Sequence, residues 1–366
     1  MAAPAISRPR SSKFSEEDWQ VYSQFWHPVA FSSELSKHKP HGVILLDVPL
    51  VLYRTSGGVV AAQRACPHRG ADLAQGWVEG DLLNCPYHGF QFNDEGNCTK
   101  LPFAGDQDVK IPKKLCLQTF KVEEKYNLIW VCLNGEPLAP LPGWSELEAS
   151  EAQGLQVLEI PASNWNSSAA RHTENFNDQA HVTVLHRDSA GGFVNPVHCT
   201  KENWAVSETE HGASIVISDV DKDLSEQIYT EQEIYCPHAS DLRLTTPEGE
   251  ITKYFDAVCP VSTNKSRIFF QAVRNYQIDQ PIDDWLVFES NIVEEDRKAM
   301  EAIYPLETPL APGAEVHTIA DQFCMAYRRK LQSYGMTSMG DSGEKWYDVE
   351  GWRYYPDDYS LTYVSG

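Results

Sequence analysis

Two short cysteine–histidine motifs constrain the fold of this chain more than any other feature. The first is Cys66-Pro67-His68 and the second is Cys85-Pro86-Tyr87-His88, with sixteen residues between them. Each motif offers one thiolate and one imidazole. Two cysteines on one iron and two histidines on the other form the ligand set of one type of [2Fe–2S] cluster. The sequence therefore predicts two loops that meet at a shared iron–sulfur cluster.

A structural zinc ion is the alternative, because two cysteines and two histidines also suit Zn²⁺. Zinc fingers place their histidine pair on a helix, and no helix signal surrounds His68 or His88. Gly70 and Gly89 follow the two motifs. Glycine lets backbone amides approach sulfur closely, and such hydrogen bonds tune a cluster. We therefore favour the iron–sulfur interpretation.

The two motifs resemble the pattern of Rieske proteins, C-x-H followed about sixteen residues later by C-x-x-H. Rieske proteins of respiratory complexes carry one further cysteine in each loop, joined as a disulfide. The matching positions here are Ala71 and Tyr87, so the resemblance is to Rieske ferredoxins and Rieske oxygenases. It implies a Rieske [2Fe–2S] cluster bound by Cys66, His68, Cys85 and His88.

A second group of metal-binding residue types lies about ninety residues further along, at Asp178, His181 and His186. Asp178 and His181 are three apart and share one face of a helix. His181 and His186 are five apart, about 140° around an ideal helix, so they converge only if the helix ends or distorts between them. Two imidazoles and a carboxylate form the facial triad of non-haem Fe(II) oxygenases. Taken alone, this spacing also fits a hydrogen-bonded pair on the surface.

The acid-rich segment 281–304 is the expected source of the carboxylate, because it has the pattern of an amphipathic helix. At about 100° per residue, Asp296 lies about 40° from the centre of the apolar stripe. Glu295 lies about 60° off on the other side, and Glu294 points nearly opposite. A carboxylate that faces a protein core is neutralised or binds a metal. A solvated acidic patch is the alternative, and it suits Glu294 better than Asp296.

Beside the first site, the second motif resembles the mononuclear-iron motif of Rieske oxygenases. The resemblance implies Fe(II) bound by His181, His186 and Asp296, with Asp178 as the acid that links the two iron centres. Residues 293–301 are similar to the stretch from which demethylase-type members supply their aspartate. Residues 320–331 are similar to the C-terminal helix of methylxanthine N-demethylases.

The distribution of strand and helix signals predicts an α+β protein. Short apolar runs between turn residues indicate an all-β segment from 42 to 133, followed by a proline-rich linker. A second β-rich stretch at 204–274 lies between helical segments at 168–186 and 281–303, with a further helix at 313–333. The expected domains are a helical segment at 1–40 that packs on the core, a Rieske domain at 41–145, and a catalytic domain at 146–366. By resemblance, that last domain has an antiparallel sheet wrapped around helices, the helix-grip or START-like arrangement, and an extended arm beyond 334.

Charge and composition restrict the partners. The formal net charge of −22 argues against nucleic acid and anionic membrane surfaces. No apolar run reaches membrane-spanning length. Nine cysteines without disulfide-framework spacing favour a reducing compartment, so we expect a cytoplasmic protein. The chain has no G-x-G-x-x-G after a strand, so no dinucleotide-binding unit is visible.

By resemblance, the chain is the terminal oxygenase of a multi-component system. Electrons would come from a separate flavin and iron–sulfur reductase that uses NAD(P)H, directly or through a ferredoxin. With O2, the enzyme would hydroxylate or oxidatively demethylate a small aromatic or heterocyclic substrate. Family members assemble as trimers or other rings, in which one subunit's cluster lies near the next subunit's iron.

Two other functions remain open from the residues. One is a ring cis-dihydroxylating dioxygenase. The other is a Rieske electron carrier fused to a ligand-binding domain, which needs none of Asp178, His181, His186 and Asp296. Phe288 and Glu289, about two turns before Asp296, are candidates for the pocket lining. Glu289 would either hydrogen-bond a polar heterocycle or be an ordinary solvated helix acid.

Overall fold

Two compact units make up the chain in the computed structural model. It describes residues 5–105, 107, 109–150, 152–189, 200, 203–218, 228–310 and 315–337. The first unit comprises residues 1–12 and 23–140, and the second comprises 13–22 and 141–366. The arm predicted beyond residue 334 falls almost entirely outside the described residues.

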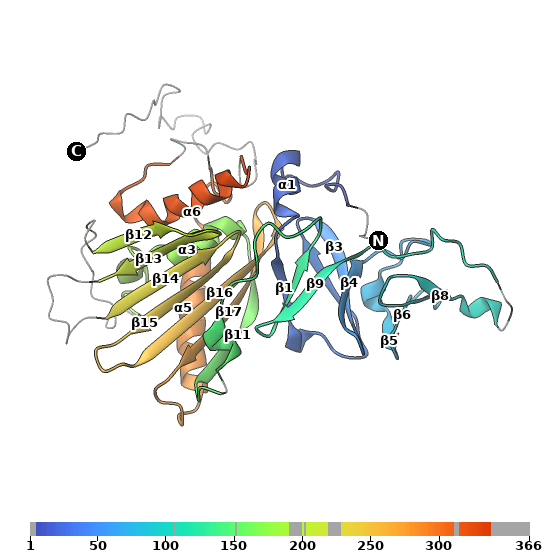
Figure 1. The fold of residues 1–366 in the computed structure, drawn as a ribbon, viewed down its shortest axis with the longest axis horizontal. Coiled ribbons are helices and arrows are strands. Elements are labelled where there is room, and N and C mark those ends of the chain that lie inside the picture. The colour runs from blue at the N-terminus through green and yellow to red at the C-terminus, as the bar shows by residue number, and fades with distance from the viewer. Residues whose placement is uncertain are drawn as a thin grey trace, which may run out of the picture. The chain divides into compact units, whose positions relative to one another are not determined.

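The first unit contains two antiparallel sheets (Figure 1). The larger sheet has the order β1-β10-β9-β4-β3-β2, and the smaller has the order β5-β6-β7-β8. The strands of the larger sheet are β1 (His27–Phe31), β2 (His41–Leu45), β3 (Val48–Thr55), β4 (Gly58–Gln63), β9 (Thr119–Lys125) and β10 (Leu128–Cys132). Those of the smaller sheet are β5 (Trp77–Glu79), β6 (Leu82–Asn84), β7 (Gln91–Phe92) and β8 (Cys98–Lys100). Short 3₁₀ helices lie at Ser32–Glu34 (η1), Leu73–Gln75 (η2) and Pro102–Ala104 (η3).

Tight turns set the register of the larger sheet. Tyr126 and Asn127 join β9 to β10 and both have positive φ, 61° and 56°. Two successive residues with positive φ form the hairpin turn whose twist matches that of the strands it joins. One core cluster then gathers residues of both sheets, including Tyr53 of β3 and Phe92 of β7, with Cys66 and Cys85 at its edge. The turns and this core hold the two cysteine-bearing loops in place.

The second unit is built on a seven-stranded antiparallel sheet in the order β11-β17-β16-β15-β14-β13-β12. Its strands are β11 (Gln156–Trp165), β12 (Trp204–Glu208), β13 (Gly212–Ile217), β14 (Tyr229–Tyr235), β15 (Ala239–Thr245), β16 (Ile251–Ser262) and β17 (Lys265–Arg274). Its helices are α1 (Glu16–Tyr22), α2 (Ser145–Glu148), α3 (Ala169–Asn177), α4 (Val182–Leu185), α5 (Asp283–Glu301) and α6 (Gln322–Ser333), with a 3₁₀ turn η5 (Ile319–Asp321).

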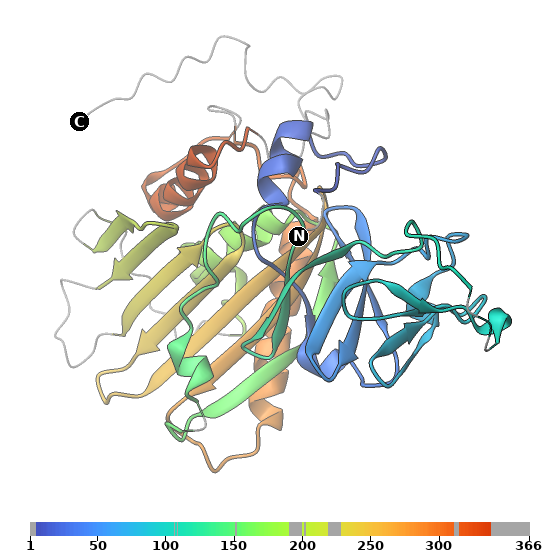
Figure 2. The same ribbon diagram turned by 45° about the vertical axis from the view of Figure 1, so that its right-hand side comes forward.

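Helices cover the sheet of the second unit. Helix α5 packs on β11, α3 on β15, β16 and β17, and α6 on β12 and β13, as the views in Figures 1 and 2 show. Trp285 of α5 is buried against Leu158 of β11 and Phe270 of β17. The amphipathic pattern of 281–304 therefore places one stripe of α5 on the sheet. Asp296 lies on the same helix, which also contacts α3.

Helix α1 belongs to the second unit although it lies between two segments of the first unit in sequence. Ser15 caps it, since its Oγ accepts a hydrogen bond from the backbone N–H of Asp18 at 3.0 Å. Asp18 is fully buried and its Oδ1 accepts a hydrogen bond from the backbone N–H of Thr337 at 2.6 Å. Helix α1 is thus joined to the segment that follows α6, within the second unit.

The C-terminal helix begins later than the sequence pattern predicts. Helix α6 starts at Gln322 rather than near 313, after the 3₁₀ turn η5. Thr318 stops the helix from extending backwards, because its backbone is extended and its Oγ1 accepts a hydrogen bond from the N–H of Ala320. Among the described residues, no helix has the length and apolar character needed to cross a membrane.

Candidate metal centres

The two cysteine–histidine loops have the same backbone design. In the first, which joins β4 to β5, Gly70 N–H donates to the carbonyl of Cys66 at 2.8 Å. In the second, which joins β6 to β7, Gly89 N–H donates to the carbonyl of Cys85 at 2.9 Å. Both glycines have left-handed backbones, with φ of 74° and 70°. Glycine adopts this conformation at little cost, which explains its place after each motif.

These loops bring the four candidate cluster ligands together. Cys66 and Cys85 are buried, 3% and 0% exposed, and each thiol is free of any disulfide. His68 and His88 lie further out, with their Nδ1 atoms 3.3 Å apart. Burial, together with the neighbouring Cys85 thiol, raises the pKa of Cys66 to about 11. Two inner sulfur and two outer nitrogen donors fit a [2Fe–2S] cluster with unlike ligands on its two irons.

The second site forms where a helix breaks. Helix α3 starts at its cap Ser168 and ends at Asn177, and the short helix α4 begins at Val182. Asp178 is the C-terminal cap of α3, with an extended backbone at φ −91° and ψ 108°. The predicted helix thus breaks between Asp178 and His181, ahead of both histidines. His181 and His186 are the two cap residues of α4, which ends at Leu185, so the backbone of His186 has already left the helix at φ −97° and ψ 20°.

Helix α5 supplies the carboxylate that completes this site. The candidate ligand atoms of His181, His186 and Asp296 all lie within 4.8 Å of one another. Asp296 Oδ1 lies 3.5 Å from His181 Nε2 and 3.2 Å from His186 Nε2. Among the described residues this oxygen is enclosed and has no hydrogen-bond partner. Two imidazole nitrogens and an enclosed carboxylate oxygen that converge on one point fit a divalent iron ion.

The electrostatics of the second site favour a cation. Burial would raise the pKa of Asp296, but the imidazoles of His181 and His186 hold it well below its usual range. Burial would lower the pKa of His181, but the nearby carboxylates of Asp178 and Asp296 raise it to about 9. The carboxylate therefore stays ionised, and positive charge is stabilised between these three side chains.

Glu295 is a residue of this site that the sequence pattern did not identify. Its Oε2 lies 2.7 Å from His186 Nδ1 and also accepts a hydrogen bond from Ser189 Oγ at 2.7 Å. This contact makes Nδ1 the protonated nitrogen and turns Nε2 towards Asp296. Metal-binding histidines are commonly oriented by such a partner. The only signal in the sequence was the 60° offset of Glu295 from the apolar stripe, which places it on the inner side of α5.

Asp178 lies beside the site and faces partly outwards. Its Oδ2 lies 3.7 Å from His181 Nδ1, and its Oδ1 accepts a hydrogen bond from the N–H of Ala180 at 2.8 Å. The side chain is 36% exposed. The Oδ1 atom of Asp178 is therefore held by the backbone, and its Oδ2 atom faces Nδ1 of His181.

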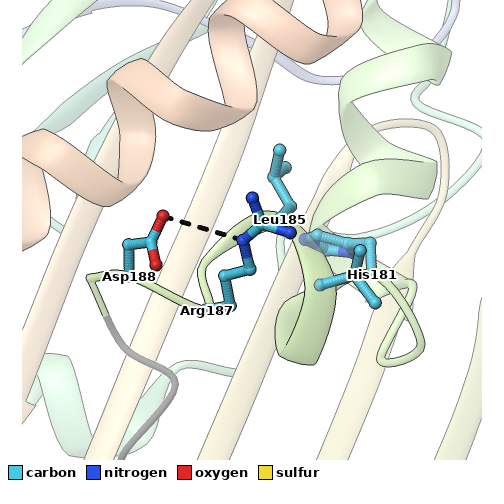
Figure 3. A pocket seen from close by; sticks show the side chains of 5 residues that line it. His181, Leu185, Arg187 and Asp188 are labelled. Carbon is cyan, nitrogen blue, oxygen red and sulfur yellow. Dashed lines mark ion pairs between the residues drawn. The ribbon is translucent and has the colours of Figure 1, made fainter.

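A shallow pocket opens at α4, on the outer side of the second site (Figure 3). Of the three candidate iron ligands, only His181 lines it. The other lining residues are Val184, Leu185, Arg187 and Asp188, the last two joined by an ion pair of 3.7 Å.

Three of the remaining described histidines of the second unit have ordinary hydrogen-bond partners. His172 Nε2 lies 2.8 Å from Asp256, and His238 Nε2 lies 2.9 Å from the hydroxyl of Tyr22. His211 contacts the hydroxyl of Tyr334, and His317 is exposed. His198 lies outside the described residues.

Comparison with known families matches both halves of the chain. Residues 25–121 match the Rieske [2Fe-2S] domain, and residues 165–335 match the vanillate O-demethylase oxygenase C-terminal domain. The first match contains both cysteine–histidine loops. The second contains His181, His186 and Asp296.

Individual relatives agree with these matches. The chain is 28% identical to the methylxanthine N1-demethylase of Pseudomonas putida over 341 residues, 86% of this chain and 90% of that protein. It is 41% identical to the oxygenase component of dicamba O-demethylase from Stenotrophomonas maltophilia over 119 residues, 32% of this chain and 34% of that protein. The solved structure of the Pseudomonas putida enzyme NdmB superposes with a TM-score of 0.76 at 26% identity, covering 87% of this chain and 93% of that one.

Both halves of the chain, in the same order, thus have the family's domains, and the two Pseudomonas putida relatives match most of its length. The chain belongs to the Rieske non-haem iron oxygenases, as an oxygenase component of the monooxygenase and demethylase type.

Proposed function

We propose that this protein is the terminal oxygenase that oxidatively removes a methyl group from a small aromatic or heterocyclic substrate. One oxygen atom of O2 enters the methyl C–H bond, and the other leaves as water with two electrons and two protons. The resulting hydroxymethyl group separates as formaldehyde and leaves the N–H or O–H product. The names of the relatives, N-demethylase and O-demethylase, support this reaction class.

The observation that carries the proposal is the convergence of His181, His186 and Asp296 in a chain that also has a separate Cys₂His₂ site. An electron carrier would need only the Cys₂His₂ site. In the proposal, Cys66, His68, Cys85 and His88 hold the Rieske cluster, and the other three residues hold Fe(II). Held by these residues, the cluster would supply single electrons and the mononuclear iron would supply the chemistry of O2 activation. The protein residues fix both donor sets, and Glu295 holds the tautomer of His186.

We further propose that Asp178 couples the two centres across a subunit interface in a ring-shaped homo-oligomer, most simply a trimer. Its Oδ2 is directed to His181 Nδ1, and its exposure leaves room for a second imidazole. The variant Asp178→Asn should retain both metals but lose most turnover, because the amide is a poorer acceptor for imidazole N–H groups. Iron analysis and product formation measure the two effects separately. Turnover at the parent rate would contradict the bridging role.

Electrons would come from a separate reductase, with or without a ferredoxin, since relatives carry the names oxygenase component and iron-sulfur subunit. A flavin and iron–sulfur protein that uses NAD(P)H is the proposed donor. We place the protein in the cytoplasm, because the eight described cysteines form no disulfide, and thiols persist in reducing compartments.

The decisive experiment counts iron and acid-labile sulfide in the purified protein and follows formaldehyde release with a surrogate reductase. The proposal expects three irons per chain, two of them in the cluster. The variant His186→Ala should keep the visible spectrum of the cluster, lose one iron, and release no formaldehyde. His317→Ala, at an exposed histidine outside both sites, is the matched control and should behave as the parent. Two irons in the parent protein, or product from His186→Ala, would refute the oxygenase.

A further inference from the structure

Glu289 is a buried acid that neither metal site uses. It lies on α5, two turns before Asp296, and is only 4% exposed. The sequence left two roles open for it, a substrate contact and a solvated helix acid. Its burial excludes the second. A helix rises about 1.5 Å per residue, so seven residues place Glu289 about 10 Å from Asp296 along α5.

The hydrogen bonds of Glu289 leave half of its carboxyl group unused. Tyr254 of β16 donates its hydroxyl to Oε1 at 2.9 Å, and Trp285 donates its indole N–H to the same atom at 2.9 Å. Among the described residues, Oε2 has no hydrogen-bond partner. Glutamine would satisfy both donors through its own carbonyl oxygen. Packing therefore does not require an acid here, although burying one costs free energy.

Aromatic rings surround this carboxyl group. Tyr254 and Phe270 lie 5.6 Å apart between ring centres, and Phe270 and Phe176 lie 6.0 Å apart. All three belong to the cluster between the sheet and α5 that also contains Trp285 and Phe288. A carboxylate set among aromatic faces favours a positively charged or N–H-bearing partner and repels an anion.

We propose that Glu289 determines substrate specificity by binding a basic nitrogen or N–H group at the end of the substrate opposite the reacting methyl group. This inference rests on the proposed function, since it places the methyl group at Asp296 and its histidine partners. The substrate class is a methylated aromatic or heterocycle with a cationic or N–H end, about one ring away from the methyl. Carboxylate-bearing methyl ethers are disfavoured.

The ionisation of Glu289 gives the proposal a measurable signature. Burial raises the pKa of Glu289 to about 7, and the hydrogen bonds from Trp285 and Tyr254 partly offset this. Of the charged groups on β16, Lys253 pairs with Glu146 and Asp256 contacts His172. Arg274 of β17 lies over the Trp285 ring at 4.3 Å, and Tyr254 has a pKa well above its usual value. Affinity for a cation should therefore rise as the pH increases through about 7, where Glu289 loses its proton.

Three matched probes test the inference by calorimetric binding, which does not depend on turnover. They are 4-methoxybenzylamine, 4-methoxytoluene and 4-methoxybenzoate, which differ only in the charge opposite the methoxy group. The parent protein should bind the amine about tenfold more tightly than the neutral probe at pH 8, and bind the benzoate most weakly. Glu289→Gln should abolish the preference and its pH dependence while binding 4-methoxytoluene within about twofold of the parent. Glu294→Gln changes an acid that pairs with Arg297 on the same helix, and should bind all three probes as the parent does.

A second variant retains the acid and covers the case in which Glu289→Gln does not fold. Tyr254→Phe removes one donor to Oε1, so the pH midpoint of amine binding should move upwards. Equal binding of the amine by the parent and Glu289→Gln, or an unmoved midpoint in Tyr254→Phe, would overturn the inference. Failure of the proposed function would look different. The protein would then lack the third iron and release no formaldehyde, but it would still bind the amine more tightly than the neutral probe.

Discussion

At the scale of single residues, the second metal site depends on a neighbour that is not itself a ligand. Imidazole has two nitrogens, and only the unprotonated one can bind a metal. In His186, the protonated Nδ1 donates to the carboxylate of Glu295 at 2.7 Å. The unprotonated Nε2 can therefore bind the metal. Adjacent acids on one helix thus have different tasks. Asp296 faces the histidines directly, Glu295 orients one of them, and Glu294 pairs outwards with Arg297.

Replacing Glu295 by alanine should weaken binding of the mononuclear iron by about 10- to 100-fold, because His186 loses the partner that fixes its orientation. Titration of the iron-depleted protein with Fe(II) measures this affinity. The cluster spectrum should not change. Glu294→Ala is the matched control at the adjacent position and should bind Fe(II) as the parent does. Equal affinity in Glu295→Ala would show that His186 is held by its backbone alone.

Asp241 gives a second prediction at the residue scale, on stability. Burial raises its pKa to about 6, although Lys253 at 3.5 Å and the Tyr235 hydroxyl at 3.1 Å lower it in part. The folded protein therefore binds this proton more tightly than the unfolded chain, whose aspartate pKa is about 3.9. The resulting stability is fully present below about pH 4 and is lost as the pH rises through 6.

The comparison of the parent with Asp241→Asn isolates this effect, because other groups titrate alike in both proteins. Between pH 7.5 and pH 5, the parent should gain about 1 kcal/mol of unfolding free energy relative to the variant. Urea titrations at the two pH values provide the measurement. If the difference in unfolding free energy between the two proteins is the same at both pH values, Asp241 has an ordinary pKa. The neighbouring charges of Glu233 and Glu146 are unchanged in this comparison.

At the scale of elements, a buried charge cluster joins helix α6 to helix α3. Arg328 of α6 donates to Glu174 of α3 at 2.7 Å and to Glu315 at 2.7 Å. Its side chain is only 8% exposed. Glu174 lies four residues before Asp178, so this contact holds the end of α3 from which the metal site begins.

Removing Arg328 leaves two acids, Glu174 and Glu315, facing the single guanidinium of Arg171, so one negative charge is uncompensated. Arg328→Ala should lower the free energy of unfolding by about 3–5 kcal/mol. The adjacent Arg329 is 54% exposed and pairs with Glu208 at 3.1 Å, so Arg329→Ala should cost less than about 1 kcal/mol. Urea unfolding of both variants tests the contrast. Similar losses in the two would show that burial does not set the strength of these contacts.

Elements also show what sequence alone can predict. Residue spacing was enough to require that the helix end or distort between His181 and His186, and α4 ends at Leu185. It did not predict the break between Asp178 and His181, which the spacing had placed on one helix face. Turn residues were enough to separate the strands. The period of α5 correctly located its inner face. It did not reveal that Glu289 meets Tyr254 or that Glu295 meets His186, because those partners are distant in sequence and the helical period describes only one side of a contact. The start of α6 was missed because a capping residue, Thr318, outweighed the apolar pattern.

At the scale of the whole molecule, charge governs how electrons arrive. The formal net charge is −22, so a reductase or ferredoxin with a basic docking face would be attracted over distances set by the Debye length. Raising NaCl from about 50 mM to about 500 mM should slow reduction of the cluster by such a partner by roughly tenfold or more. Stopped-flow bleaching of the cluster absorbance measures this rate. A salt-independent rate would indicate docking through apolar contacts instead.

The position of α1 has a consequence for how the chain is made. This helix leaves the ribosome before the residues it binds, since its contacts include Tyr22 with His238 and Asp18 with Thr337. Translation must produce more than two hundred further residues before the earliest of these partners exists. Residues 23–140 of the first unit are therefore made before α1 meets these partners, and α1 completes its contacts only once Thr337 has been made. Deletion of α1 should therefore harm the second unit rather than the residues that follow it directly.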